Sequence, residues 1–278
     1  MTDLLGTCLS WDEQACVVQP EDGEPVTIAL TDIVSGKPVP PRPSVRHRVS
    51  VREAEGRTGA LWPDLERVPL GQWELRYDAA PVGRVRKRAN SCLAVGDPGV
   101  PIADAAEEVL AFYRARSRDP LAQVEAGSAV EDQLRGLGWH DLGHGEAELR
   151  LAAVSRVRRT LRRPEATVEL SVSGTLATAT VGTGCDPIGE AQARLDGDWL
   201  GVFGLTVDPA HRRRGIASAL LSELLDWGAE QGALTAWLHV ETANPEGQAF
   251  WEALGFAAHH TCRYYAPPSS ASGSPVSR

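Results

Sequence analysis

Three arginines and a glycine stand where an apolar run gives way to a helical pattern, at Arg212, Arg213, Arg214 and Gly215. The run over residues 202–207 has the length and composition of a buried strand. Asp208-Pro209 ends it, because proline cannot donate to a sheet. The first N–H groups of a helix have no internal partner, and a glycine lets a ligand approach the backbone. The stretch therefore predicts a cradle for a pyrophosphate.

This cradle is of neither the Rossmann nor the P-loop kind, since the stretch has no G-x-G-x-x-G and no G-K-[ST]. Its order, V-x-P followed by R-x-x-G-x-A at the start of a helix, resembles the acetyl-CoA loop of the GNAT acetyltransferase superfamily. The matching residues are Val207, Pro209, Arg212, Gly215 and Ala217, with Ala217 in place of the usual second glycine. The alternative is an ordinary strand–loop–helix connection with solvated arginines.

A second motif follows in the order that this family shows. Asn244 and, seven residues later, Trp251 precede Leu254-Gly255-Phe256. This is similar to the GNAT ending, in which an asparagine contacts the cofactor and an aromatic residue precedes L-G-F. The resemblance covers about residues 167–266, and two separate motifs at the expected spacing make it specific.

The resemblance implies an α/β fold with a mixed sheet, the GNAT fold, and acetyl-CoA as co-substrate. Backbone groups of Leu205 and Val207 are then expected to contact the pantetheine arm, and residues 212–218 to hold the pyrophosphate. The expected cofactor-binding residues are Leu205, Thr206, Val207, Arg212, Arg213, Arg214, Gly215, Ile216, Ala217, Ser218 and Asn244.

An amine acceptor must lose a proton before or during acetyl transfer. For a lysine-like amine with a pKa of about 10.4, the neutral form at pH 7 costs about 4.6 kcal/mol, so a base or a water relay helps. Gly201 stands where some family members carry a catalytic glutamate, and Trp251 where many carry an acidic tyrosine. An indole is no practical proton donor.

Other side chains can take these roles. His239 and Glu241 share one face of a predicted strand over residues 235–241, by its period of two. Tyr264, on the last predicted strand, can protonate the departing thiolate, as can its neighbour Tyr265. The candidate catalytic residues are Glu241, His239 and Tyr264, and for each of them a packed or solvated side chain is the alternative.

Composition narrows the remaining classes of function. The formal net charge of −9 argues against general nucleic-acid binding. Five cysteines, odd in number and never in a C-x-x-C pair, favour a reducing compartment over a disulfide framework. No signal peptide or membrane-length apolar run is present, so a soluble cytoplasmic protein is expected. His259-His260 has no third ligand in sight, and no metal is predicted.

The chain divides into four expected parts. Residues 1–44 predict a small SH3-like β module with a proline-rich linker, as in some actinobacterial-type GNAT proteins. Residues 45–150 look like a degenerate copy of residues 151–266, because Leu137-Gly138-Trp139 matches Leu254-Gly255-Phe256. The copy lacks the arginine loop, with only residues 96–99 in its place. Residues 267–278 predict a disordered tail.

The arginine-rich segment over residues 147–163 predicts a helix, with a solvated inter-lobe face favoured over a nucleic-acid patch. The first interpretation of the whole is an acetyl-CoA-dependent N-acetyltransferase that transfers acetyl directly to an amine of a small molecule or a protein. The alternative is a non-catalytic acyl-CoA-binding or regulatory module. The residues do not indicate an oligomeric state.

Overall fold

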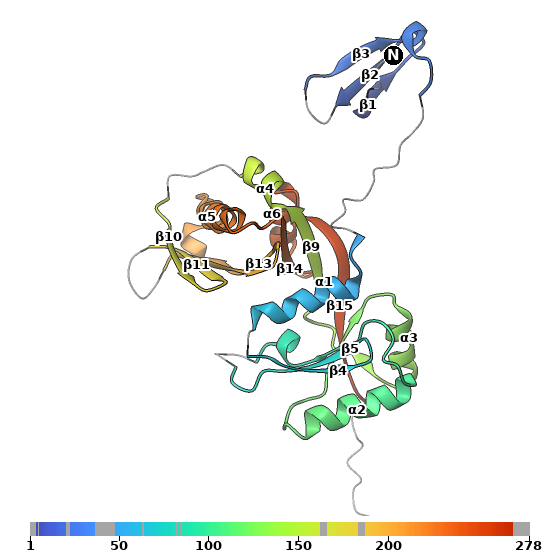
Figure 1. Ribbon diagram of the computed structural model, residues 1–278, viewed down its shortest axis with the longest axis vertical. Coiled ribbons are helices and arrows are strands. Elements are labelled where there is room, and N and C mark those ends of the chain that lie inside the picture. The colour runs from blue at the N-terminus through green and yellow to red at the C-terminus, as the bar shows by residue number, and fades with distance from the viewer. Residues whose placement is uncertain are drawn as a thin grey trace, which may run out of the picture. The chain divides into compact units, whose positions relative to one another are not determined.

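The computed structural model, shown in Figure 1, describes residues 4, 6–20, 23–36, 48–62, 64–81, 83, 85–161, 166–182 and 187–268. The chain forms two compact units, Met1–Pro43 and Ser44–Arg278. No helix among these described residues is long and apolar enough to cross a membrane. The predicted proline linker and the tail after residue 268 lie outside the described residues.

The first unit is an antiparallel sheet in the order β1-β2-β3. Its strands are β1 (Gly6–Trp11), β2 (Ala15–Pro20) and β3 (Val26–Ala29), and the short helix η1 (Leu30–Asp32) follows. Three strands are present in the described part of this unit, so the five-stranded SH3-like barrel is not confirmed.

The second unit is built on one twelve-stranded mixed sheet, in the order β10-β11-β12-β13-β14-β9-β15-β7-β6-β5-β4, with β8 beside β15. Its strands are β4 (Glu66–Leu70), β5 (Trp73–Tyr77), β6 (Cys92–Leu93), β7 (Ala122–Glu125), β8 (His140–Asp141), β9 (Ala147–Ala153), β10 (Glu169–Ser173), β11 (Leu176–Val181), β12 (Gly189–Asp196), β13 (Trp199–Val207), β14 (Thr235–Glu241) and β15 (Ala257–Ala266). Helices and a mixed sheet together confirm the predicted α/β class.

Two helical layers pack on this sheet and define two lobes. In the first lobe, α2 (Ile102–Arg114) and α3 (Ala129–Gly136) bury a core around Trp73 and Leu134. In the second, α4 (Val154–Thr160), α5 (Ile216–Glu230) and α6 (Pro245–Ala253) cover β11 to β14. Each lobe holds a strand–helix–strand unit with parallel strands, β6-α2-β7 and β13-α5-β14.

The lobes share strands at their junction. β9 lies between β14 and β15, antiparallel to both, and β15 runs on to pair with β7 of the first lobe. The predicted helix over residues 147–163 is therefore wrong in its first half, since α4 begins only at Val154. Leu149 and Leu151 alternate with Arg150 at the strand period, and the many arginines obscured that signal. Residues 162 and 163 lie outside the described part.

A short helical segment ahead of the first lobe covers the junction. It consists of α1 (Val51–Gly56) and η3 (Arg57–Leu61), and Ser50 caps α1 by accepting from the N–H of Glu53 at 3.1 Å. Ala54 packs with buried side chains of β9, β13 and β14. Figure 1 shows α1 beside β15, between the two lobes. The remaining short helices are η4 (Lys87–Ala89) and η5 (Pro209–His211).

Candidate active site

The sheet splits between two parallel strands. β13 and β14 pair only over Trp199–Thr235, Leu200–Ala236 and Gly201–Trp237, although both strands continue well beyond. Past this point β13 changes from buried to partly exposed residues. Backbone groups on the facing edges are thus left for another partner. The split can receive an extended ligand as if it were an added strand.

A bulge marks the mouth of the split on β13. Gln192 lies opposite Phe203 and Glu190 opposite Thr206, so β13 holds one residue more than β12 here. Gly204 lies at this bulge with a φ of +66°, a conformation that favours glycine. The bulge re-aims the backbone at Leu205, the first residue expected to contact the pantetheine arm.

The turn after β13 is built as a helix N-terminus with open amides. Gly215 precedes α5 with a φ of +79° and offers no side-chain cap. The first helical hydrogen bond runs from the N–H of Ala219 to the carbonyl of Gly215 at 2.9 Å. The N–H groups of residues 216–218 therefore have no partner inside the helix. Open amides and a helix dipole of this kind are the features that the predicted anion site requires.

The arginines of this turn differ in conformation and contacts. Arg213 has a φ of +59°, which is uncommon for a residue other than glycine. The Nε of Arg212 donates to the carbonyl of Val207 at 3.4 Å, while Arg213 and Arg214 are exposed. The strained backbone at Arg213 thus lies directly beside the open amides.

Asn244 begins the next helix. Its Oδ1 accepts from the N–H of Gly247 at 2.9 Å and caps α6. This leaves the NH₂ end of the amide to donate to a ligand. α5 and α6 follow the carboxyl ends of two adjacent parallel strands, so both helix starts lie at one edge of the sheet, where α/β folds bind ligands.

The two departures from the family pattern both have packing causes. A Cβ at Gly201 would lie 2.6 Å from Cζ2 of Trp237 and 3.1 Å from Cδ2 of Leu61, so no acidic side chain fits. Trp251 is buried in the core of the second lobe, with its ring centroid 5.2 Å from that of Phe256. Neither position carries proton transfer here.

His239 lies two residues beyond Trp237, the last residue of β14 that pairs with β13. Leu238 and Val240 point to the α5 side of the sheet, where they join the core of the second lobe, and His239 points to the other side. Its side chain is 6% exposed, and its Nε2 lies 2.8 Å from Oε1 of Glu55 in α1. Burial, with a smaller contribution from the charge of Arg88, lowers the pKa of His239 to about 4 against the pull of Glu55. The imidazole is thus neutral at pH 7.

The other two predicted catalytic residues lie around a small cavity. Exposed Glu241 ends β14 and, with the loop over residues 141–146, lines a cavity of about 150 Å³. Tyr264 is buried beneath this loop, and a Cβ at Gly145 would lie 3.6 Å from its ring. Burial raises the pKa of Tyr264 to about 12, so it stays protonated. Among the described residues, no hydrogen bond joins Tyr264 to His239 or Glu241.

The fold places Glu55 against His239 and His260, a contact that the spacing of residues in the sequence did not reveal. Glu55 is fully buried against His239 and His260. Atoms able to bind a metal ion, one each from Glu55, His260 and Cys262, lie within 4.8 Å of one another. The sequence expectation that His260 lacks further ligand-type neighbours is therefore corrected. No sequence signal marks Glu55, because its partners are 184 and 205 residues away.

Comparisons with known proteins agree with this geometry. The family described as "Probable histone acetyltransferase Rv0428c C-terminal" matches residues 147–265, which begin at β9. The "Probable histone acetyltransferase Rv0428c" of Mycobacterium tuberculosis is 27% identical over 285 residues, covering 95% of this chain and 88% of the relative. The "[Ribosomal protein bS18]-alanine N-acetyltransferase" of Escherichia coli is 38% identical over 66 residues, which cover 24% of this chain and 45% of that protein.

A solved structure shows the same fold over most of the chain. The "GCN5-related N-acetyltransferase from Kribbella flavida" aligns with a TM-score of 0.60 at 16% identity, covering 79% of this chain and 96% of that one. The full-length relative, the family match at the second lobe and this fold agree with the split sheet and the open amides. Together these findings support a GNAT-superfamily acetyltransferase, with the family match lying in the second lobe.

Proposed function

We propose that this protein transfers an acetyl group from acetyl-CoA directly to an amine, with the split between β13 and β14 as the place of transfer. One observation carries the proposal. The open edges of β13 and β14 and the uncapped start of α5 adjoin each other, while His239 points from the opposite face of the sheet beside the split. Donor and acceptor can thus reach the same point from two sides.

The cofactor is held mainly by backbone groups. The pantetheine arm lies along β13, where Leu205 and Val207 offer N–H and C=O groups, and the diphosphate meets the amides of residues 215–218. A hydrogen bond to a charged group contributes about 1.5–3 kcal/mol. Arg213 and Arg214, which are exposed beside these amides, add charge attraction, and Asn244 donates from the start of α6.

The acetyl transfer then needs two proton movements. The amine nitrogen attacks the thioester carbonyl, a C–N bond forms, and the C–S bond breaks. Neutral His239 accepts the proton that the amine loses, directly or through a water molecule. Tyr264, which stays protonated, supplies a proton to the sulfur of coenzyme A, and Glu241 attracts the cationic form of the amine to the cavity at the end of β14.

The acceptor class is proposed as an amine of a protein, with small amines as the second class. Two relatives carry names that specify histone and ribosomal-protein substrates, and these names support the choice of a protein amine. We also propose a cytoplasmic location, because all four cysteines in the described part of the chain are free thiols.

The test is release of free coenzyme A from acetyl-CoA with a panel of acceptors. The panel holds peptides with only a free α-amine, peptides with only a lysine amine, and small diamines. Faster release with any of them, together with acetylated product by mass spectrometry, supports the proposal. Binding of acetyl-CoA without release on the whole panel would favour the non-catalytic acyl-CoA-binding module instead.

A further inference from the structure

We propose that Glu55, which precedes the first lobe, is a positioning residue that holds His239 of the second lobe in the form able to accept the amine proton. This inference rests on the proposed function and adds a residue from outside the acetyltransferase core to it. The observation is a buried carboxylate with a complete set of hydrogen-bond donors, placed behind the candidate base.

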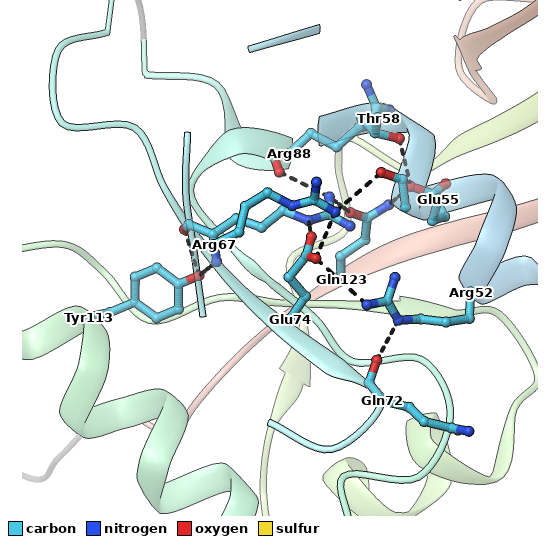
Figure 2. A network of polar contacts seen from close by, with 11 residues as sticks. Arg52, Glu55, Thr58, Arg67, Gln72, Glu74, Arg88, Tyr113 and Gln123 are labelled. Carbon is cyan, nitrogen blue, oxygen red and sulfur yellow. Dashed lines mark hydrogen bonds and ion pairs between the residues drawn. The ribbon is translucent and has the colours of Figure 1, made fainter. Parts of the chain in front are cut away.

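The carboxylate of Glu55 is held from both sides. Its Oε1 lies 2.8 Å from Nε2 of His239 and 3.1 Å from Nε2 of His260. Its Oε2 accepts from Oγ1 of Thr58 at 3.3 Å and from Nε2 of Gln123 at 2.9 Å, as Figure 2 shows. The fully buried group therefore cannot swing away from His239 without breaking several hydrogen bonds.

The orientation of Gln123 is fixed by a buried arginine. Nη1 of Arg76 donates to Oε1 of Gln123 at 3.4 Å, and its Nε donates to Glu74 at 3.0 Å. A guanidinium only donates, so the amide oxygen of Gln123 faces Arg76 and the NH₂ group faces Glu55. The amide on the first-lobe strand β7 thus serves as a donor to Glu55.

The histidine tautomers follow from the same reasoning. The carbonyl of Val49 only accepts, so Nε2 of His259, 3.0 Å away, donates to it. The Nδ1 atoms of His259 and His260 lie 2.7 Å apart, and one of them donates to the other. Nε2 of His260 donates to the carboxylate of Glu55, which only accepts.

His239 is left neutral, with its proton on Nε2. Burial would raise the pKa of Glu55, but its interactions with His239 and His260 outweigh burial and hold that pKa well below its usual range. The ionised carboxylate accepts Nε2–H of His239 and leaves the lone pair on Nδ1 for an incoming proton. A carboxylate that orients an imidazole and stabilises the imidazolium serves the same purpose in hydrolase triads.

The negative charge of Glu55 lowers the free-energy cost of placing a proton on the buried imidazole of His239. Arg88 and, to a smaller extent, His260 oppose a positive charge on His239. Cys262 and Tyr264 on β15 face the same cluster, and burial raises the pKa of both, so they stay neutral. Glu55 is the one negative group that the described residues place against His239.

The test is Glu55→Gln, which keeps the size of the side chain and removes its charge. With a strongly basic amine, kcat should fall about 100-fold, at the lower end of what general base catalysis contributes, while the KM for acetyl-CoA stays unchanged. With a weakly basic amine that is already neutral at the assay pH, the fall should be several-fold smaller, because that amine needs little help from a base. A purely structural role would lower both rates equally.

Glu131→Gln is the matched control. Glu131 is also a buried carboxylate, and it accepts from Tyr265 and Arg263, but among the described residues it hydrogen-bonds neither His239 nor His260. Its loss should leave the ratio of the two amine rates unchanged. Glu55→Asp, which retains the charge, should keep more of the selectivity between amines than Glu55→Gln and serves if the glutamine variant does not fold.

Two results would overturn the inference while leaving the proposed function in place. One is an equal loss of rate with both amines in Glu55→Gln and Glu55→Asp. The other is one equivalent of zinc by elemental analysis of the purified wild type, since Glu55, His260 and Cys262 would then be ligands. A wild type that acetylates no amine at all would instead refute the proposed function.

Discussion

Two glycines on either side of the active site have opposite purposes. Gly215 keeps space free at the start of α5, where its φ of +79° exposes the amides that follow. At Gly201, the indole of Trp237 occupies the space that an acidic side chain would need. At the scale of single residues, Gly201 on β13 thus offers no base, and His239 on β14 is the base that we propose.

Gly215→Glu should weaken acetyl-CoA binding about 100-fold, or roughly 2.8 kcal/mol. A carboxylate at this position repels the diphosphate and covers the open amides. The measurement is calorimetric titration with coenzyme A. Gly232→Glu is the control, because Gly232 also has a positive φ, of +89°, and lies in open space at the far end of α5. Equal affinities of the two variants would contradict the site.

His239→Gln should keep the affinity for acetyl-CoA and lower kcat by about 100-fold or more, as expected for a general base. Glutamine retains a group able to hydrogen-bond Glu55 but cannot accept a proton at neutral pH. Steady-state release of coenzyme A measures the effect. A variant with wild-type kcat would shift the role of base to Glu241, whose replacement by glutamine is the companion experiment.

At the scale of elements, strands and helices are tied together by a few buried side chains. Trp237 on β14 fills the space over Gly201 on β13, beside Leu61 of η3. In the first lobe, Glu131 on α3 accepts from Tyr265 on β15 and from the N–H of Gly127. Buried packing contacts and hydrogen bonds of this kind fix the positions of these strands and helices relative to one another.

Gly201→Ala should lower the free energy of unfolding by about 1–3 kcal/mol, the usual cost of overpacking a core. The added methyl group would lie 2.6 Å from the indole of Trp237, which is itself buried. Urea denaturation measures the change. Gly136→Ala, with open space in α3, is the control and should be neutral or stabilising. Equal effects would show that β13 and β14 can move apart at no cost.

The tie at Glu131 should make stability depend on acid pH. Burial would raise the pKa of Glu131, but hydrogen bonds from Gly127, Tyr265 and Arg263 outweigh it and lower that pKa. A lowered folded-state pKa stabilises the fold above the unfolded value of about 4.5 and ceases to do so as the pH falls through the folded value. Urea midpoints of wild type and Glu131→Gln should therefore differ at pH 7 and converge below pH 4.5.

At the scale of the whole molecule, the two lobes of the second unit form one continuous sheet. β9 lies between β14 and β15 in the sheet of the second lobe. β15 extends from the second lobe and pairs with β7 of the first lobe. Glu55, from ahead of both lobes, contacts His239 and His260 of the second lobe and Gln123 of the first. The first lobe is thus joined to the candidate active site even though it has no arginine turn.

Leu134→Ala, in the core of the first lobe, should lower the unfolding midpoints of both the first and the second lobe. Removal of a buried leucine side chain costs about 2–5 kcal/mol, and the shared strands should transmit this loss. Hydrogen exchange of the amides in α5 reports on the second lobe. Val18→Ala in the first unit is the control and should leave that exchange unchanged. Faster exchange confined to the first lobe would show that the lobes unfold separately.

The sequence by itself determined the open turn before α5, the α/β class and the candidate residues on β14. These depend on local physics, because a proline-ended strand followed by a glycine at a helix start produces open amides wherever it occurs. Three features were decided only by tertiary structure: the insertion of β9 beside β14, the filling of the Gly201 position by Trp237, and the burial of Glu55 against His239. Each depends on contacts between segments far apart in the chain, which leave no periodicity or spacing to read.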